Sequence, residues 1–217
     1  MSTFQAIVVY LIVLLFPHVS TPRIDPTPAR WSDRYESPIV LRTGRAEHRL
    51  DVVTPWVQGH CTATAVGKHT LLTASHCYYA TRGWKLDGKS IAITSVDFDN
   101  NDHLLLVTDQ TFADFVPIVQ RPIKDNEQVF SITEPGKYEH VAVFGIVVGS
   151  RDEAEFGDGQ HHIYLLVLPS QPGSSGAAIM DYSGNVIAVI AGSNADNTMS
   201  FELGFTPAQL ETVAKDK

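Results

Sequence analysis

Several classes of protein are excluded by what this sequence lacks. Only two cysteines occur among 217 residues, and two lone cysteines do not supply the four ligands of a structural zinc site. There is no run of like charges and no basic stripe, and the formal net charge is −8. Nucleic-acid binding is therefore not expected, because neutralising phosphates requires clustered Lys and Arg. With 44% hydrophobic and 18% charged residues, the chain is typical of a globular protein with a sizeable core.

The apolar run at the N-terminus is too short to cross a bilayer. It reads "FQAIVVYLIVLLF" over residues 4–16, whereas a membrane-spanning helix needs ~20 residues. Its length is typical of a secretory signal, and the small residues Ser20 and Thr21 follow where a peptidase could cut. No Lys or Arg precedes the run, so an uncleaved anchor stays open. We predict a signal peptide or membrane anchor over residues 1–20, with the rest secreted or held outside the cytoplasm.

A proline-rich linker and a β-rich body are expected to follow. Three prolines within "TPRIDPTPAR" favour an extended linker, which we place at residues 21–44. Beyond it, short runs rich in Val, Ile, Leu and Thr alternate with turn signals such as Asp87-Gly88 and Pro135-Gly136. This pattern indicates an all-β sandwich or barrel. The expected strands lie at 62–66, 69–74, 90–94, 103–107, 141–149, 162–168, 176–180 and 185–192.

The end of the chain carries the signals of a helix. Thr206 can cap its N-terminus, Pro207 suits the first helical position, and Gln209 stands where a capping-box partner belongs. Leu210 and Val213 would share one face. We therefore predict that a short C-terminal helix closes the β-rich body.

The two cysteines, Cys61 and Cys77, lie 77 − 61 = 16 positions apart. A secretory leader implies an oxidising compartment, which favours a disulfide, and two buried free thiols are the alternative. The disulfide would join the strand that begins at Cys61 to the residue after His76. It would hold the backbone of that histidine in place.

Three polar residues stand at the ends of apolar strands. "LLTASHC" places His76 at the end of one strand, "NNDHLLLV" places Asp102 at the start of another, and "PGSSGAAI" places a serine before a third. An imidazole can take the proton of a serine hydroxyl and return it to a leaving amine, and a buried carboxylate can orient that imidazole. Asp97 and Asp99 are rivals for the carboxylate; Asp102 is preferred because it directly precedes the apolar strand.

These motifs resemble those of the trypsin/chymotrypsin-like serine proteases. "TASHC" resembles the family's "TAAHC" box, the cysteine separation equals that of the family's disulfide beside the catalytic histidine, and "DHLLLV" is similar to "DIALL". "GSSGAAI" is similar to "GDSGGP", and "GNVIAVIAGS" is similar to the strand that walls the substrate pocket. The resemblance covers roughly residues 45–214. Together the histidine and serine boxes are specific, whereas either alone would be weak.

The resemblance implies a fold and an activity. It implies two six-stranded antiparallel β-barrels, at residues 45–125 and 126–217, the second carrying the closing helix. His76 and Asp102 would come from the first barrel and the serine from the second. The implied activity is peptide-bond hydrolysis through an acyl-enzyme, with a protein or peptide as substrate and without metal or cofactor. The alternatives are a non-catalytic binding domain on the same fold and a self-processing protease of viral type.

The serine box assigns roles position by position. In the family's Gly-x-Ser-Gly pattern, Gly173 is the first glycine and Ser175 the nucleophile, and the N–H groups of these two residues form the oxyanion hole. If Ser174 were the nucleophile, the first position would fall on Pro172, which has no N–H. Ser175 is therefore the predicted nucleophile.

Departures from the family pattern imply further properties. Digestive members have Asp before the nucleophile, paired with a new N-terminus after cleavage, whereas Ser174 cannot make that ion pair. We therefore expect an oxyanion hole that forms without proteolytic activation. The predicted pocket residues are Pro169, Ala191, Gly192 and Ser193. None is charged, so a small or apolar P1 residue is expected in place of Arg or Lys.

The His-to-Asp separation of 102 − 76 = 26 is shorter than in digestive enzymes and is similar to that of compact bacterial and viral members of the family.

The adjacent residues His161 and His162 lie in an expected strand, where neighbours face opposite sides. We expect one of them to be buried and the other exposed, so the two do not bind one metal.

Overall fold

The computed structural model describes residues 37–217 except 54–57, 79–82, 154–160 and 194–196. The predicted leader, and the expected linker as far as residue 36, lie outside the described residues. Within the described part of the chain, no helix is long and apolar enough to span a membrane.

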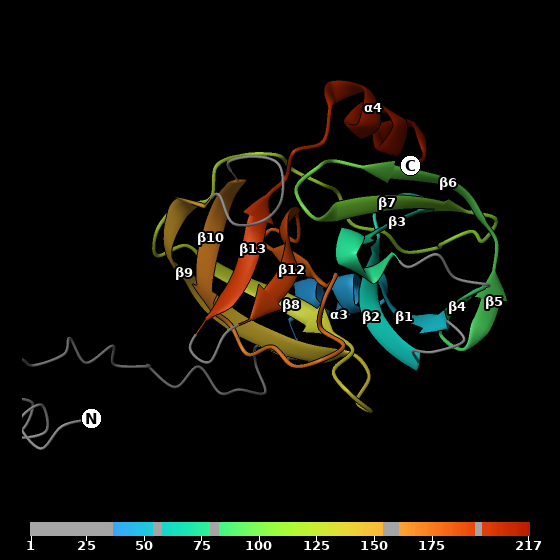
Figure 1. The fold of residues 1–217 in the computed structure, drawn as a ribbon, viewed down its shortest axis with the longest axis horizontal. Coiled ribbons are helices and arrows are strands. Elements are labelled where there is room, and N and C mark those ends of the chain that lie inside the picture. The colour runs from blue at the N-terminus through green and yellow to red at the C-terminus, as the bar shows by residue number, and fades with distance from the viewer. Residues whose placement is uncertain (1–36, 54–57, 79–82, 154–160, 194–196) are drawn as a thin grey trace, which may run out of the picture. The chain divides into compact units, whose positions relative to one another are not determined.

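The first half of the body is one antiparallel sheet of seven strands, in the order β5-β4-β1-β2-β3-β7-β6 (Figure 1). Its strands are β1 (Glu47–Val53), β2 (Gln58–Ala65), β3 (Thr70–Ala74), β4 (Trp84–Leu86), β5 (Lys89–Ile91), β6 (Ile93–Phe98) and β7 (His103–Thr108). The short β4–β5 hairpin turns at Asp87 and Gly88, both with left-handed backbone at φ 50° and 76°. It extends the sheet beyond β1, with which β4 pairs.

The second half closes into a six-stranded barrel in the order β10-β13-β12-β11-β8-β9. Its strands are β8 (Gln128–Thr133), β9 (Val141–Glu153), β10 (His161–Val167), β11 (Ala178–Met180), β12 (Val186–Ser193) and β13 (Thr198–Glu202). Figure 1 shows this barrel beside the first sheet, with α3 between β8 and β1. The predicted chymotrypsin-like fold class is thereby confirmed. The first half differs in detail, because it has seven strands in an open order where six were expected.

Helix α3 (Pro38–Gly44) corrects part of the expected linker. Residues 38–44 were assigned to the linker, but they form a helix with Pro38 in its first turn. Val40 and Thr43 are buried, and the Thr43 hydroxyl donates to the carbonyl of Ile39. The sequence pattern did not predict this helix because a proline-rich segment precedes it.

Helix α4 (Pro207–Lys215) has the predicted capping box, in which Thr206 and Gln209 each accept a backbone N–H of the other. Although it follows the barrel in sequence, it binds the first sheet. Gln209 Nε2 donates to Asp97 Oδ1 at 2.7 Å, and Asp216 Oδ2, just after the helix, accepts the Thr70 hydroxyl at 2.8 Å. The end of the chain therefore fastens the two halves together.

The larger of the two hydrophobic clusters joins both halves. It includes Leu50, Leu72 and Leu106 of the first sheet and Phe130 and Met180 of the barrel. All five are within a few per cent of full burial. Because this core is continuous, loops that meet where the halves adjoin are supported from both sides.

Candidate active site

His76 and Asp102 meet at the edge of the first sheet. His76 lies in the 3-10 turn Ser75–Cys77 that directly follows β3, and Asp102 directly precedes β7. The distance from His76 Nδ1 to Asp102 Oδ2 is 2.8 Å. Because a carboxylate only accepts, the proton lies on Nδ1, and Nε2 of the neutral ring is left as an acceptor. The imidazole is 41% exposed, so this nitrogen can be reached.

Asp102 is fixed by further hydrogen bonds from the same turn. Its Oδ1 accepts the Ser75 hydroxyl at 2.7 Å and the backbone N–H of His76 at 2.9 Å. Burial acts to raise the pKa of Asp102, but the hydrogen bonds from His76 and Ser75 outweigh it, so the pKa lies below its usual value. Asp102 is therefore ionised at neutral pH and can stabilise a protonated His76.

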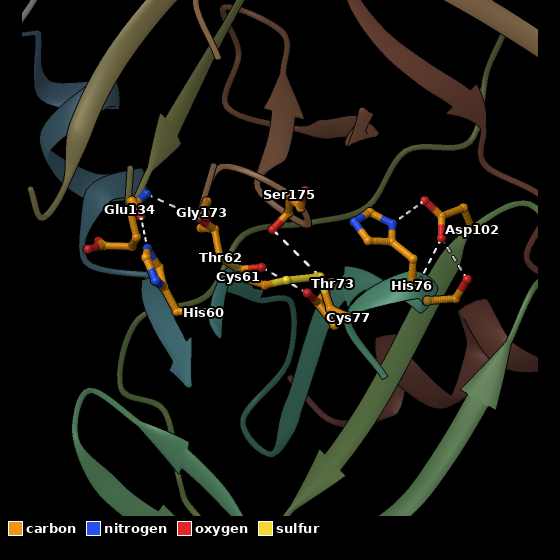
Figure 2. The surroundings of a disulfide bond; sticks show 11 residues. His60, Cys61, Thr62, Thr73, His76, Cys77, Asp102, Glu134, Gly173 and Ser175 are labelled. Atoms are coloured by element: carbon orange, nitrogen blue, oxygen red, sulfur yellow. Dashed lines mark hydrogen bonds and ion pairs between the residues drawn. A yellow bond between two sulfur atoms is a disulfide. The ribbon is translucent and has the colours of Figure 1, made fainter. Parts of the chain in front are cut away.

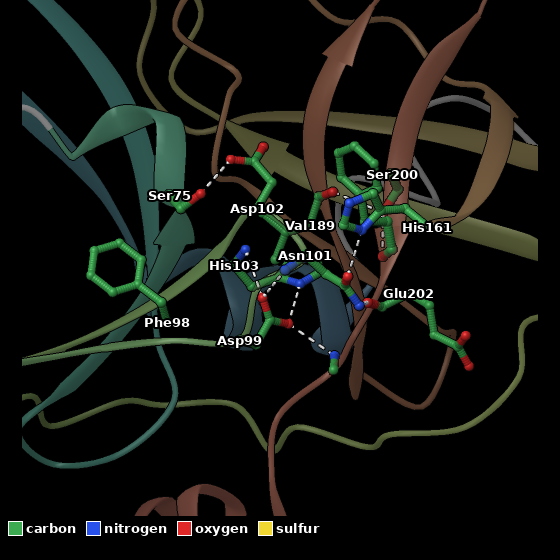
Figure 3. Close-up of polar contacts among 12 residues, drawn as sticks. Ser75, Phe98, Asp99, Asn101, Asp102, His103, His161, Val189, Ser200 and Glu202 are labelled. Carbon is green, nitrogen blue, oxygen red and sulfur yellow. Dashed lines mark hydrogen bonds and ion pairs between the residues drawn. The ribbon is translucent and has the colours of Figure 1, made fainter. Parts of the chain in front are cut away.

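A second carboxylate, Asp99, lies under the loop that carries Asp102 (Figure 3). Its side chain is fully buried and accepts the backbone N–H groups of Asn101, His103 and Gly204 as well as Nδ1 of His103. The backbone is left-handed at Asn100 and at Asp102, with φ of 68° and 61°. Asp99, the alternative candidate for the carboxylate, thus hydrogen-bonds the two residues that flank Asp102. Its histidine partner is His103 and not His76.

Asn101 ties this loop to the barrel. Its Nδ2 donates to the carbonyl of Glu202 at 3.0 Å, and its Oδ1 lies 2.8 Å from Nδ1 of His161. His161 is 8% exposed, as predicted for one of the two adjacent histidines. His162, which was expected to be exposed, is half-buried instead, with Nδ1 2.8 Å from Asp152 Oδ1.

Cys61 and Cys77 form the predicted disulfide. Cys61 lies in β2, and Cys77 ends the turn that holds His76, so the bond clamps that turn onto the sheet. The carbonyl oxygen of Ser175 lies 4.0 Å from Cys77 Sγ and accepts the N–H of Thr62 at 2.8 Å. Strand β2 therefore holds both parts of the site: it is hydrogen-bonded to the serine loop through Thr62 and joined to the histidine turn by the disulfide.

The serine loop turns tightly at two glycines that tolerate no side chain. Gly173 and Gly176 have φ of 101° and 86°. A Cβ on Gly173 would lie 2.3 Å from His60 Nε2, and one on Gly176 would lie 2.2 Å from Thr73 Oγ1. Both positions thus require glycine because of their backbone conformation and their close contacts.

The peptide groups of this loop have a defined orientation. The carbonyl of Pro172 accepts the N–H of Gly136 at 3.0 Å, and the carbonyl of Ser174 accepts the N–H of Ala177 at 3.1 Å. In a planar trans peptide the N–H points opposite to the carbonyl. The N–H groups of Gly173 and Ser175 therefore point away from these anchors. Among the described residues neither N–H has an acceptor.

Figure 2 shows Ser175 on the side of the His76 ring that faces away from Asp102. Ser175 is half-buried, and no hydrogen bond joins its hydroxyl to His76 in this structure. Catalytic hydrogen bonds are often long before substrate binds. In Figure 2 the ring of His76 thus lies between Ser175 and Asp102.

A cleft of about 830 Å³ opens beside His76 and Asp102. Of the predicted pocket residues, Ala191 lines it. The other three predicted pocket residues do not line this cleft: Gly192 and Ser193 follow Ala191 on β12, and Pro169 is exposed after β10. The other lining residues are Ser75, Phe98, Asn100, Asn101, His161, Met199 and Phe201. The sequence pattern missed Met199 and Phe201, because β13 alternates too briefly to be recognised as a strand.

Metal binding has no support in the described part of the chain, where no group of three or more His, Cys, Asp and Glu side chains could hold an ion. The arrangement at His76 is suited to proton transfer. One edge of the imidazole contacts an ionised carboxylate, and Ser175 lies on the side of the opposite edge.

A closed barrel beside an antiparallel sheet, with a serine loop from one facing a His–Asp pair from the other, is the architecture of chymotrypsin-like proteases. The chain belongs to the trypsin-like peptidase domain family, whose sequence profile matches residues 61–189, more than half of its length. No curated protein sequence matches the chain.

Solved structures of proteases share the fold. The active form of the Rv3671c protease from M. tuberculosis is 18% identical, with a TM-score of 0.68 over 82% of this chain and 83% of that one. The serine endoprotease from Yersinia pestis is 15% identical, with a TM-score of 0.64 over 82% and 66%. The HtrA-type protease AlgW, solved with a decapeptide, is 16% identical, with a TM-score of 0.63 over 82% and 66%. At these identities the likeness establishes the fold.

Proposed function

We propose that the protein is a serine endopeptidase with Ser175 as nucleophile, His76 as general base and acid, and Asp102 as the carboxylate that orients His76. The observation that carries this proposal is the His76–Asp102 hydrogen bond of 2.8 Å. It leaves Nε2 on the ring edge that faces Ser175 (Figure 2).

In the proposed reaction, Nε2 of His76 takes the proton of the Ser175 hydroxyl as its oxygen bonds to the scissile carbonyl carbon. The imidazolium is stabilised by the ionised Asp102. It then protonates the departing amine, which leaves an acyl-enzyme on Ser175. A water molecule, deprotonated by His76, then attacks the acyl-enzyme, which releases the carboxylic acid product and restores the Ser175 hydroxyl.

The N–H groups of Gly173 and Ser175 would stabilise the negative oxygen of each tetrahedral intermediate. Their lack of acceptors among the described residues supports this role. The Gly136 N–H that holds the Pro172 carbonyl supports an oxyanion hole that exists without cleavage of the chain. An ion pair from position 174 is not needed in this arrangement.

An uncharged specificity pocket is part of the proposal. Ala191, Gly192 and Ser193 carry no charge, and Phe98, Met199 and Phe201 make much of the cleft apolar. A peptide with small or apolar side chains would bury them there without leaving a charge unpaired. The HtrA-type protease AlgW, which was solved with a decapeptide, supports a peptide as the ligand class.

Digestion of a mixed peptide library by the full chain tests the function. Cleavage after small or apolar residues is expected, with few cuts after Lys or Arg, and Ser175→Ala should lower the rate by roughly 10⁴-fold or more. Cleavage that is unchanged in Ser175→Ala would overturn the assignment. The absence of cleavage by the wild type would favour a peptide-binding domain on this fold.

A further inference from the structure

The oxyanion loop needs an anchor that its own sequence does not contain. By the resemblance stated above, Ser174 stands where the digestive members of the family have the acid of an ion pair. Its side chain is almost fully buried, and its hydroxyl accepts the N–H of Gln171 within the same loop at 3.3 Å. Ser174 therefore cannot tie the loop to the rest of the protein by an ion pair.

The turn at Glu134–Gly136, which follows β8, contacts this loop through its backbone. The N–H of Gly136 donates to the carbonyl of Pro172 at 3.0 Å. The N–H of Glu134 donates to Thr62 Oγ1 at 3.0 Å, and that hydroxyl donates to the carbonyl of Gly173 at 2.8 Å. The turn thus holds the Pro172–Gly173 peptide directly, and it contacts the Gly173–Ser174 peptide through the Thr62 hydroxyl of β2.

Close packing adds to these hydrogen bonds. His60 Nε2 lies 2.8 Å from the carbonyl oxygen of Glu134, and Figure 2 shows both residues beside Gly173. A Cβ on Gly173 would lie 2.3 Å from His60 Nε2 and 2.6 Å from that oxygen. The loop therefore has no room to shift toward the turn, and its position depends on where the turn lies.

The turn is itself held by the Glu134 side chain. This carboxylate is 1% exposed, and its Oε1 accepts the backbone N–H of His140 at 2.9 Å and lies 3.2 Å from His140 Nδ1. Thr133 and Val141 form the last pair of the β8–β9 ladder. The Glu134–His140 contact thus closes the base of the hairpin loop just beyond the ladder. Arg49 holds the other side of the turn, donating to the carbonyl of Gly136 at 3.0 Å.

We propose that Glu134 is a positioning residue that holds the oxyanion hole in its working geometry. Its carboxylate fixes the turn, the turn holds the Pro172–Gly173 peptide directly and the Gly173–Ser174 peptide through Thr62, and these peptides orient the Gly173 N–H. Among the described residues no hydrogen bond joins Glu134 to Ser175. This inference rests on the proposed function of Ser175, and it explains how the hole forms although Ser174 is not an acid.

The test compares Glu134→Ala, which removes the acceptor for the His140 N–H, with Glu134→Gln, which keeps it. Glu139→Ala, in the same loop but exposed, is the matched control. For each full-length variant we would measure kcat and KM on one peptide substrate, the melting temperature, and amide hydrogen exchange of residues 171–177.

For Glu134→Ala we expect kcat to fall about 10- to 100-fold with KM within about threefold, since an oxyanion donor acts mainly in the transition state. Exchange over residues 171–177 should rise in the same variant. Glu134→Gln should keep kcat within about threefold of the wild type, and Glu139→Ala should match the wild type, because neither loses the hydrogen bond to His140. A purely structural role would lower the melting temperature without this split between kcat and KM.

Equal kcat in Glu134→Ala and the wild type would overturn the inference while leaving the proposed function intact. So would faster exchange over residues 171–177 without loss of kcat. An inactive wild type would overturn the proposed function and this inference with it. If Glu134→Ala does not fold, Glu134→Asp, which keeps the charge but shortens its reach, must show the same loss of kcat.

Discussion

Two buried carboxylates support the two halves of the proposed active site, and they do so differently. Asp99 lies under the Asp102 loop and accepts four hydrogen bonds, from three backbone N–H groups and the His103 ring. Glu134 supports the serine loop and receives contacts on Oε1 alone, while Oε2 has no partner within the described residues. Their side chains are equally buried, at 0% and 1% exposure.

The difference in donors changes the charge state that burial favours. Burial acts to raise both pKa values. At Asp99 the hydrogen bonds from His103, Gly204 and Asn101 outweigh it, and the pKa lies below its usual value. At Glu134 the contacts with His140 offset burial only in part, and the pKa lies above its usual value. At these two equally buried carboxylates, the hydrogen-bond donors and the neighbouring charges, which include Asp87 and Glu139 beside Glu134, set opposite directions of the pKa shift.

The largest effect that would sharpen this comparison is expected for Asp99→Ala. The change leaves His103 and three N–H groups buried without their acceptor, which should cost about 3–5 kcal/mol of unfolding free energy. Urea denaturation measures this loss, with Asp125→Ala at an exposed position as the control, for which a loss below about 1 kcal/mol is expected. Similar losses in the two variants would contradict the role given to Asp99.

A smaller effect, of opposite sign at the two sites, is expected in the pH dependence of stability. Asp99, with its lowered pKa, stabilises the fold above the pKa of an unfolded Asp, and this contribution is lost as the pH falls through its native pKa. The difference in unfolding free energy between the wild type and the less stable Asp99→Asn should therefore become smaller toward acid pH.

Glu134, with its raised pKa, acts in the reverse sense. Between its ordinary and its native pKa the folded state holds the proton more tightly, so stability falls as the pH rises through that range. Relative to the wild type, Glu134→Gln should therefore gain stability as the pH rises. Unfolding free energies from denaturant titrations over a series of pH values measure both trends. If both variants gained stability relative to the wild type in the same direction of pH change, the opposite pKa shifts of Asp99 and Glu134 would be contradicted.

The sequence indicates candidate site residues more clearly than the elements that support them. His76, Asp102 and Ser175 are candidates because each stands next to an apolar strand and carries characteristic neighbours. Asp99 and Asp102 could not be told apart with certainty, because both precede the same strand. Their roles depend on the left-handed backbone at Asn100 and Asp102, which no pattern of hydrophobicity reports.

For the supporting turn at Glu134–Gly136, the sequence predicts a turn at Pro135-Gly136 but not its contacts with the serine loop. Its effect on Gly173 depends on the barrel closing β8 against β11, which brings distant parts of the sequence together. Strand β1 escaped recognition because three charged residues interrupt its apolar pattern, and helix α3 because a proline-rich segment precedes it. Interactions between distant segments, which the sequence does not display, thus decide these features.

The most direct test of the central claim is covalent labelling of the full chain, carrying an uncleaved N-terminal tag, with a fluorophosphonate. We expect one adduct, located on Ser175 by peptide mass spectrometry. The adduct should be absent in Ser175→Ala, greatly slowed in His76→Ala, and still formed on Ser175 in Ser174→Ala. An adduct on Ser174, labelling that appears only after the tag is removed, or no labelling of the wild type would contradict a preformed site built on Ser175.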